Sequence, residues 1–378
     1  MFSVYRMIRE SWSQQQTMAG VAPPEAPEFP AVPQLQPEPG SRQFGMCPAC
    51  DSPFARLLFT AGDRRWATTD RLFQIVECSE CRLIRLFPQP APEELRGYYP
   101  PDYWRPADQN LPGPNSFGRH LAGRHFNDWL RRKYRKLALA DDVRFVERAL
   151  REAEEQGIIL DVGCGDGFLL GILAARGHGP AIGLDFSLDA ARAAWREQHV
   201  AAICGTLSSA PFADGSCAAI SMFHVLQHLY NPVSFLDSAY RLLRPDGRLI
   251  VQVPNAACWQ FLLFGDKWQG MDVPRQLLHF RASDLETLLE HCGFEILRRK
   301  HFSLRDNPES LASSLLMALD PLIGPWRRRA ASPKVSRRGR LFWDFAHLAL
   351  VVACVPFTMF EAACGAGSTV MVEARKKS

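Results

Sequence analysis

The sequence is poor in three features: net charge, an apolar N-terminal segment and a long apolar run. Its 44 Lys and Arg nearly balance its 40 Asp and Glu. The net charge of +4 argues against a general nucleic-acid binder, whose affinity depends on many phosphate contacts. Arg6 and Arg9 stand among polar residues, without the apolar stretch of a secretory signal. We therefore expect a cytoplasmic protein, in which paired cysteines indicate metal more than disulfide.

Two nucleotide-binding signatures are also missing, although a glycine-rich loop is present. Gly163, Gly165 and Gly167 follow the apolar run Ile158–Val162 and precede a helical pattern. No Gly-Lys-Ser/Thr accompanies them, which excludes a P-loop, and the spacing lacks the extra residue of the dinucleotide fingerprint. Glycine is needed where the backbone bends sharply and a ligand lies against the main chain. The loop is therefore predicted to cradle a ligand.

Apolar strands alternate with helices beyond this loop. Strand patterns cover 180–185, 218–224 and 248–253, and helical patterns cover 188–198 and 233–243. Strands and helices that alternate at this length predict a parallel sheet with helices on both faces.

Two carboxylates stand at strand ends in this region. Asp161 lies two positions before Gly163, where it could hold the charged amino-acid end of a ligand. Asp185 ends the next strand, and a carboxylate there is well placed to accept both hydroxyls of a ribose.

These motifs resemble those of the class I S-adenosylmethionine-dependent methyltransferases, over residues 157–301 and a final strand at 368–376. The resemblance implies an α/β fold with a Rossmann-like, doubly wound, mostly parallel sheet of seven strands. It implies an enzyme whose cofactor, S-adenosylmethionine, has its methionine part in the loop 161–167 and its ribose on Asp185. The other cofactor contacts that it implies are Phe186 beside the adenine, Thr206 and Leu207 in the loop after the third strand, and His224 beside the methyl donor.

Two positions depart from the family pattern. Cys217-Ala218 stands where Phe-Asp is usual, at the start of the fourth strand. Gln227 precedes His228 where Glu is common, so a carboxylate near the methyl donor is lost.

Four of the eleven cysteines form two Cys-x-x-Cys pairs, Cys47 with Cys50 and Cys78 with Cys81. Two close pairs let four thiolates converge on one Zn²⁺ in tetrahedral geometry. A closed set of four thiolates leaves no open position for chemistry. We therefore predict a structural zinc site in a small zinc-ribbon-like module.

The region around the second pair resembles that of methyltransferases from bacterial polysaccharide and small-molecule pathways, which carry such a module before the catalytic domain. The shared features include Phe87-Pro88-Gln89-Pro90, Tyr98-Tyr99-Pro100 and Val253-Pro254-Asn255. This resemblance implies a small-molecule acceptor, with sugars the best candidates.

The chain is predicted to divide into four parts. These are a disordered, Pro-rich segment at 1–43, the zinc-binding module at 44–90, a linker and basic helical region at 91–156, and the methyltransferase domain at 157–378 with a hydrophobic helical insertion at about 310–366. The basic cluster at 131–136 is interpreted as a solvated helix face or, alternatively, as a patch for phosphate or anionic lipid.

An oxygen acceptor would need a base to take its proton. Histidine has the natural pKa for this, and His228 lies in the motif beside the methyl donor. His228 is our hypothesis for the base and His279 the second candidate; in the alternative, His228 only packs or fixes a loop.

Residues 345–360 are mostly apolar and follow an Arg- and Lys-rich stretch at 327–340. Sixteen residues interrupted by His347 and Pro356 are too short for a comfortable bilayer span of about 20. The favoured interpretation is a helix buried against the sheet or over an acceptor cavity. The alternative is peripheral membrane contact through 327–360, at the inner face of the membrane.

The expected function is methyl transfer to a small-molecule or saccharide acceptor. If residues 327–360 contact a membrane, this acceptor is expected to be linked to a lipid. An RNA methyltransferase is the first alternative, against which the modest charge and the lack of Asn-Pro-Pro-Tyr count. A non-catalytic binding protein of the same fold is the second. The presence of Asp161, the three glycines and Asp185 counts against it.

Overall fold

A computed structural model describes residues 42–99, 126–153, 157–319 and 337–377 of the chain. The predicted Pro-rich segment lies outside these residues, apart from 42 and 43. The side chains of residues 126–135, which include most of the basic cluster, and of residues 337–345 are outside the description as well.

Seven strands form the larger sheet, in the order β11-β12-β9-β8-β5-β6-β7. Their bounds are β5 (Ile158–Val162), β6 (Ala181–Asp185), β7 (Ala201–Cys204), β8 (Cys217–Phe223), β9 (Leu243–Pro254), β11 (Phe294–Lys300) and β12 (Thr369–Lys376). The five strands β5 to β9 pair in parallel. Strand β12 alone runs in the opposite direction, antiparallel to both β9 and β11. The predicted fold class is confirmed.

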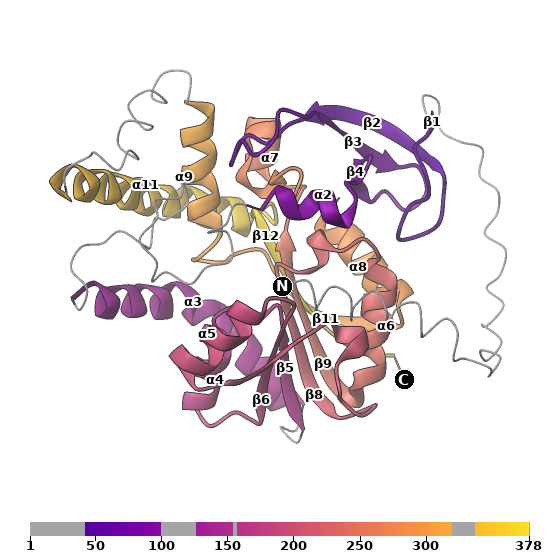
Figure 1. Cartoon of the computed structure of the whole chain (residues 1–378), viewed down its shortest axis with the longest axis vertical. Coiled ribbons are helices and arrows are strands. Elements are labelled where there is room, and N and C mark those ends of the chain that lie inside the picture. Colours follow the sequence, from indigo (N-terminus) through magenta and orange to yellow (C-terminus); the bar gives the residue numbers. More distant parts are fainter. Residues whose placement is uncertain (1–41, 100–125, 154–156, 320–336, 378) are drawn as a thin grey trace. The chain divides into compact units, whose positions relative to one another are not determined.

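Helices cover both faces of this sheet. Successive strand residues point to opposite sides, and both sides carry apolar residues that have to be buried. Leu160 and Ile220 pack in one core cluster with α6 (Pro232–Leu242) and α8 (Ala282–His291). Ile159 and Ala219 pack in another with α3 and α4. The helices on that side are α3 (Phe126–Glu152), α4 (Phe168–Ala175) and α5 (Leu188–Gln198). Figure 1 shows α6 and α8 on one side of the sheet and α4 and α5 on the other.

Local signals set the helix starts that the sequence predicts. The side chain of Asn231 accepts a hydrogen bond from the Ser234 N–H (3.0 Å), and Pro232 opens α6. The Ser187 hydroxyl likewise accepts from the N–H of Ala190, so that α5 starts at Leu188. Each side chain satisfies one of the N–H groups that a helix start leaves unpaired.

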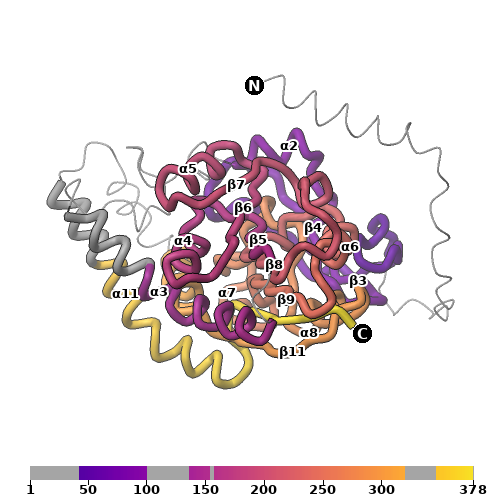
Figure 2. Tube along the Cα trace, turned by 90° about the horizontal axis from the view of Figure 1, so that it is seen from below, coloured from indigo at the N-terminus to yellow at the C-terminus, as the bar shows by residue number. Residues whose placement is uncertain are grey.

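Helix α3 belongs to the sheet domain, although the predicted domain started only at residue 157. Its residues Val143, Val146 and Leu150 are buried in the same cluster as Phe168 and Leu173 of α4. Figure 2 shows α3 beside α4. A helix of this kind is stabilised mainly by tertiary packing, which its charged sequence does not reveal.

The paired cysteines lie in a smaller sheet of order β1-β2-β3-β4-β10. Its strands are β1 (Arg42–Gln43), β2 (Phe54–Ala61), β3 (Phe73–Cys78), β4 (Ile84–Phe87) and β10 (Leu278–His279), and all pairs are antiparallel. Strand β10 comes from the part of the chain that forms the larger sheet, after residue 157. The module predicted as a separate unit at 44–90 therefore shares its sheet with that part, and the described residues of the chain fall into one compact unit.

Three further helices are α7 (Trp259–Phe264), α9 (Asn307–Ala318) and α11 (Arg337–Ala363), and α9 packs on both of the others. Helix α11 runs through Pro356 without a break and packs on α9, with Val351 and Cys354 against Leu311. Its stretch Ala346–Ala363 has a mean hydropathy of 1.7 and is only 22% buried. The helix is therefore not buried against the sheet, as one form of the favoured interpretation had it, because α11 packs on α9 along one stripe; its position over an acceptor cavity stays a prediction. In the described part of the chain it is the one helix long and apolar enough to cross a membrane.

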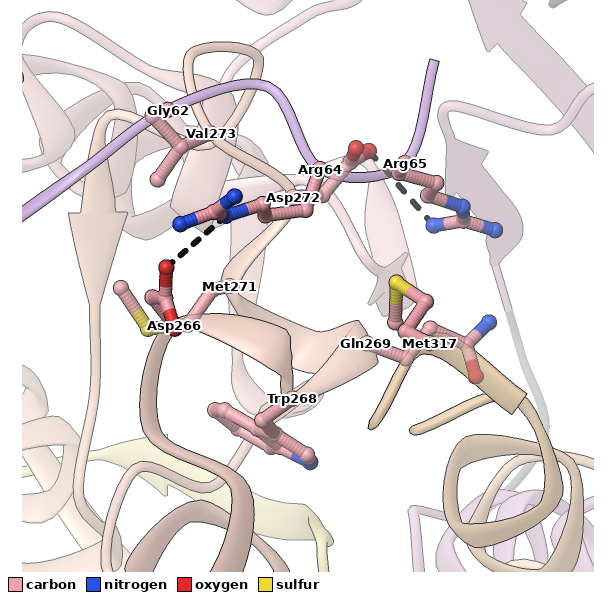
Figure 3. Close-up of a pocket in the computed structure, with 10 residues that line it drawn as sticks. All are labelled: Gly62, Arg64, Arg65, Asp266, Trp268, Gln269, Met271, Asp272, Val273 and Met317. Atoms are coloured by element: carbon pink, nitrogen blue, oxygen red, sulfur yellow. Dashed lines mark hydrogen bonds and ion pairs between the residues drawn. The ribbon is translucent and has the colours of Figure 1, made fainter. Parts of the chain in front are cut away.

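A small pocket lies where the loop 62–65 of the cysteine module meets the segment 266–273 (Figure 3). Arg64 Nε donates to Asp266 Oδ2 across it at 2.9 Å, and Arg65 lies 3.6 Å from Asp272. None of the residues predicted to bind cofactor, substrate or metal lines this pocket. It is a feature of the junction between the two sheets.

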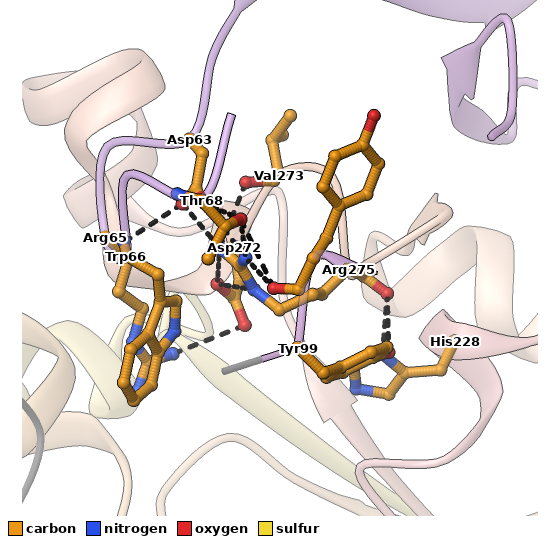
Figure 4. Close-up of polar contacts among 10 residues, drawn as sticks. Asp63, Arg65, Trp66, Thr68, Tyr99, His228, Asp272, Val273 and Arg275 are labelled. Atoms are coloured by element: carbon orange, nitrogen blue, oxygen red, sulfur yellow. Dashed lines mark hydrogen bonds and ion pairs between the residues drawn. The ribbon is translucent and has the colours of Figure 1, made fainter. Parts of the chain in front are cut away.

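Arg275 is the main polar connection at this junction (Figure 4). Its wholly buried guanidinium donates to both carboxylate oxygens of Asp63, at 3.0 and 2.5 Å, and to Asp272 Oδ1 at 3.0 Å. A further hydrogen bond of 2.8 Å reaches the carbonyl of Tyr98. Burial alone would raise the pKa of Asp63, but the hydrogen bonds and charge of Arg275 outweigh it and hold the pKa at about 2. Arg275 thus neutralises two buried carboxylates from two parts of the chain.

Replacing Arg275 by Met should lower the free energy of unfolding by about 3–5 kcal/mol, because buried carboxylates then lack a counter-charge. Urea unfolding at neutral pH measures this. Arg64→Met is the matched control, since its ion pair with Asp266 is exposed and worth about 0–1 kcal/mol. Because folding lowers the Asp63 pKa, its contribution is present above about pH 4 and lost as the pH falls toward 2. Equal costs for the two variants would contradict this account.

Candidate functional site

The order of the strands defines where a ligand would bind. From β5 the chain winds outward through β6 to β7, and it then returns to the other side of β5 for β8 and β9. In a doubly wound sheet, ligands bind at such a switch point, outside the carboxyl ends of the strands. The glycine loop follows β5 there, and His224 follows β8.

The three glycines of the loop all have left-handed backbones, with φ of 72°, 56° and 71° at Gly163, Gly165 and Gly167. A Cβ at Gly163 would come within 2.7 Å of Val225, and one at Gly167 within 2.8 Å of Ala194. A Cβ at Gly165 would meet nothing within 4 Å. The outer two glycines therefore permit close packing, and the middle one exposes bare backbone to open space. This is the surface that a cofactor lying against the main chain requires.

Asp185 braces this loop. Its Oδ2 accepts the N–H of Gly165 at 3.0 Å, and its Oδ1 accepts the N–H of Ser187 at 2.8 Å. Burial raises the pKa of this carboxyl, and the two backbone hydrogen bonds oppose that rise. A carboxylate offers about four lone-pair sites, so each oxygen keeps capacity for a ribose hydroxyl.

Asp161 lies beneath the loop and is almost wholly buried. The Ser221 hydroxyl on the neighbouring strand donates to its Oδ1 at 2.6 Å. Burial, and then the charge of Asp185, raise the pKa of Asp161 to about 7. A cation nearby would favour its ionised form.

The predicted adenine contacts lie just after the next two strands, β6 and β7. Phe186 follows β6 with its side chain 61% exposed, and the Gly205 N–H donates to the Asp185 carbonyl at 2.9 Å. Thr206 is exposed on the same side, whereas the side chain of Leu207 is wholly buried in the core. Leu207 could therefore meet a ligand only through its backbone.

His224 stands at the end of β8 with a left-handed φ of 60°, which is rare for residues other than glycine. Its Nε2 lies 3.1 Å from Asp306 Oδ2, and both side chains are partly exposed. Gln252 Nε2 donates to the same carboxylate oxygen at 2.5 Å, and Arg305 forms an ion pair with Asp306. Asp306 was not among the predicted site residues, because it is 82 residues from His224 and belongs to no motif.

His228 and His279 occupy more enclosed positions. His228 Nδ1 lies 2.8 Å from the Arg275 carbonyl, with the Tyr99 hydroxyl at 3.4 Å (Figure 4), and burial lowers the pKa of its ring. His279 is 3% exposed, and neither ring nitrogen has a partner among the described residues. Burial lowers its pKa to about 3, so the ring stays neutral and enclosed. This environment disfavours His279 as a base.

Gln227, which stands where a Glu is common, is 1% exposed. The Leu277 N–H donates to its backbone carbonyl at 2.8 Å. The exchange of Glu for Gln therefore changes a buried position and removes no exposed carboxylate beside the methyl donor.

The four paired cysteines converge, with all four Sγ atoms within 4.8 Å of one another. Cys47 lies 3.6 Å from Cys81, and Cys50 lies 3.5 Å from Cys78. Sulfurs at about 2.3 Å from a tetrahedral Zn²⁺ are about 3.8 Å apart, so the cluster fits that ion.

The turn after each cysteine pair is left-handed although neither contains glycine at the critical position. The residues there are Asp51 (φ 57°) and Arg82 (φ 66°). A left-handed conformation costs a non-glycine residue about 1–2 kcal/mol, which the rest of the cluster must offset.

Comparison with known proteins indicates the class of the domain that contains this site. Residues 129–299 match the family model of the methyltransferase domain. A protein of Mycolicibacterium smegmatis named "Probable S-adenosylmethionine-dependent methyltransferase" is 32% identical over 145 residues, which cover 36% of this chain and 52% of that protein. A ubiquinone biosynthesis O-methyltransferase of Xylella fastidiosa is 30% identical over 152 residues, 36% of this chain and 61% of that protein. The chain thus spans about half the length of the curated relatives it matches.

A crystal structure of an S-adenosylmethionine-dependent methyltransferase from Archaeoglobus fulgidus is 16% identical, with a TM-score of 0.40 over 65% of this chain and 94% of that chain. The strand order, and not this likeness, defines the fold of the chain. Residues 129–299 are a methyltransferase domain. This domain is similar to S-adenosylmethionine-dependent methyltransferases, and the strand order of its sheet is that of a doubly wound fold.

Proposed function

We propose that the protein transfers a methyl group from S-adenosylmethionine to a hydroxyl of a small-molecule or saccharide acceptor, either free or linked to a lipid. The observation that carries this proposal is the open backbone of Gly165, held by Asp185 at the switch point of the sheet. The similarity to a ubiquinone biosynthesis O-methyltransferase supports an oxygen acceptor. The net charge of +4 favours such an acceptor over RNA.

Four of the predicted cofactor residues are assigned roles from their positions in the fold. The backbone at Gly165 would lie against the methionine part, with Asp161 beneath it as the partner of the ammonium group. Asp185 would accept the ribose hydroxyls, and the exposed ring of Phe186 would cover the adenine. The bound sulfonium supplies an electrophilic methyl group, and the chain must position the acceptor in line with it.

His224, rather than His228, is the better supported base. Its Nε2–H can donate to Asp306, which leaves the lone pair of Nδ1 free to accept a proton from an acceptor hydroxyl. Nδ1 has no hydrogen-bond partner among the described residues, and the Asp306 carboxylate would stabilise the imidazolium that forms. His228 is bonded instead to a neutral carbonyl, and its lowered pKa favours the anchoring role that was its alternative.

Isothermal titration with S-adenosylmethionine and S-adenosylhomocysteine tests the cofactor. We expect micromolar binding to the purified protein and a loss of at least about 100-fold in Asp185→Ala, because a buried carboxylate–hydroxyl contact disappears along with the brace of the loop. Asp189→Ala is the matched control, since this carboxylate is 80% exposed at the start of α5. A folded protein that binds neither ligand would overturn the proposal and favour a binding protein of another specificity.

Release of S-adenosylhomocysteine with a panel of sugars, nucleotide sugars and phenols tests the base. With the first acceptor found, His224→Asn should lower kcat by roughly 10²–10⁴-fold while the cofactor Kd changes little. Asp306→Asn should lower kcat less and shift the pH profile of kcat. If His228→Asn abolishes turnover and His224→Asn does not, the base is His228.

We also propose that the cysteine cluster holds a structural Zn²⁺. Elemental analysis should find one zinc per chain, and Cys47→Ser should lose it. The melting temperature should fall as well, because β4 then holds β10 less firmly. Cys204→Ser, which changes an exposed cysteine outside the cluster, should retain both zinc and melting temperature. A wild-type protein that contains no zinc, and whose melting temperature equals that of Cys47→Ser, would exclude the site.

A further inference from the structure

Over residues 346–363, where its side chains are described, helix α11 has an outward face without a polar side chain. Between Ala346 and Ala363, every exposed residue is Ala, Val, Pro, Phe or Met. Val352, Met359 and Phe360 are 60%, 56% and 62% exposed. The exposed side of a helix in a soluble protein is normally polar, and contiguous apolar surface of this kind indicates a binding partner.

The inward face of the same helix is the more polar one. Glu361 is wholly buried, where it accepts hydrogen bonds from the side-chain amide (2.8 Å) and the backbone N–H (3.1 Å) of Gln260. His347 lies 3.6 Å from Glu309 on α9. A helix that crossed a bilayer would have to withdraw these groups from their protein partners into hydrocarbon. The helix is therefore built to lie on a surface rather than to span it.

Helix α7 extends this outward face. Leu262 and Leu263 are 77% and 66% exposed. The ring of Trp259 on the same helix lies 5.7 Å from that of Phe360 and 6.3 Å from that of Phe357. The two helices thus form one surface, which we call the α7/α11 face; Figure 1 shows α11 running past α9.

Positive charge in the sequence adjoins this face. Residues 327–340 contain seven Arg and Lys and no acid, and three of the seven (Arg337, Arg338 and Arg340) stand at the start of α11. A basic segment joined to an apolar helix face is complementary to a bilayer with anionic headgroups. A second copy of this chain, docked through the same face, would bring two such basic segments together.

We propose that the α7/α11 face binds the surface of an anionic lipid bilayer. Leu262, Leu263, Phe357, Met359 and Phe360 enter the interface. The helix stays parallel to the bilayer, with Glu361 against Gln260. This binding requires neither methyl donor nor acceptor.

Flotation of the full chain with vesicles tests the proposal. Phosphatidylcholine vesicles with about 30% phosphatidylglycerol should carry the protein upward at low salt, and far less so at high salt or with phosphatidylcholine alone. The double variant Leu262→Glu/Phe360→Glu should lower the bound fraction at least about tenfold, because charge is then forced into the apolar interface. Trp195→Glu is the control, since Trp195 is an equally exposed apolar residue on α5.

Circular dichroism and cofactor titration of each variant establish that it is folded. No flotation of the wild-type protein with anionic vesicles at low salt would overturn the proposal, as would equal binding by the double variant. So would a dimer, seen by analytical ultracentrifugation, that the double variant abolishes, since a second copy would then occupy the face. Each of these results leaves cofactor binding untouched, so the failure of this proposal is distinguishable from the failure of the proposed function.

Discussion

The buried charge of Arg275 ties the two sheets of the protein to one another. Its guanidinium neutralises Asp63 from the cysteine module and Asp272 from its own segment, while its backbone carbonyl holds His228 at the switch point. A guanidinium without exposure is stable only when every donor has a partner. The position of the loop after β8 is therefore linked, through one residue, to a module far away in the sequence.

The ligand end of the sheet is built on a second constraint, the left-handed backbone of the glycine loop. Gly163 and Gly167 allow the close approach of neighbouring residues, and Asp185 accepts the N–H of Gly165 from the adjacent strand. The loop is thus already shaped before a ligand arrives, which reduces the entropy lost on binding. The strained backbone at His224 belongs to the same rim, and strain of this kind persists where surrounding structure holds it.

Much of this arrangement could be predicted from local sequence. Apolar runs bounded by turns indicated β5, β6 and β8, and Asn231-Pro232 indicated the start of α6, because these signals lie within a few residues of what they specify. The Cys-x-x-Cys spacing likewise indicated the sulfur cluster. The pairing of His224 with Asp306, and of Arg275 with Asp63, could not be predicted, since each joins residues that only tertiary folding brings together. The exposure of one side of α11 could not be predicted, because apolar composition alone does not say whether a face meets protein or another surface.

The pairing of β10 with β4 has a consequence for how such a protein can change over evolutionary time. Two backbone strands, one from each side of a presumed domain boundary, complete a single sheet. A module inherited separately would leave an open strand edge on both fragments, which invites aggregation. An exchanged cysteine module would therefore keep this sheet intact only if the segment around residues 272–280 were exchanged with it.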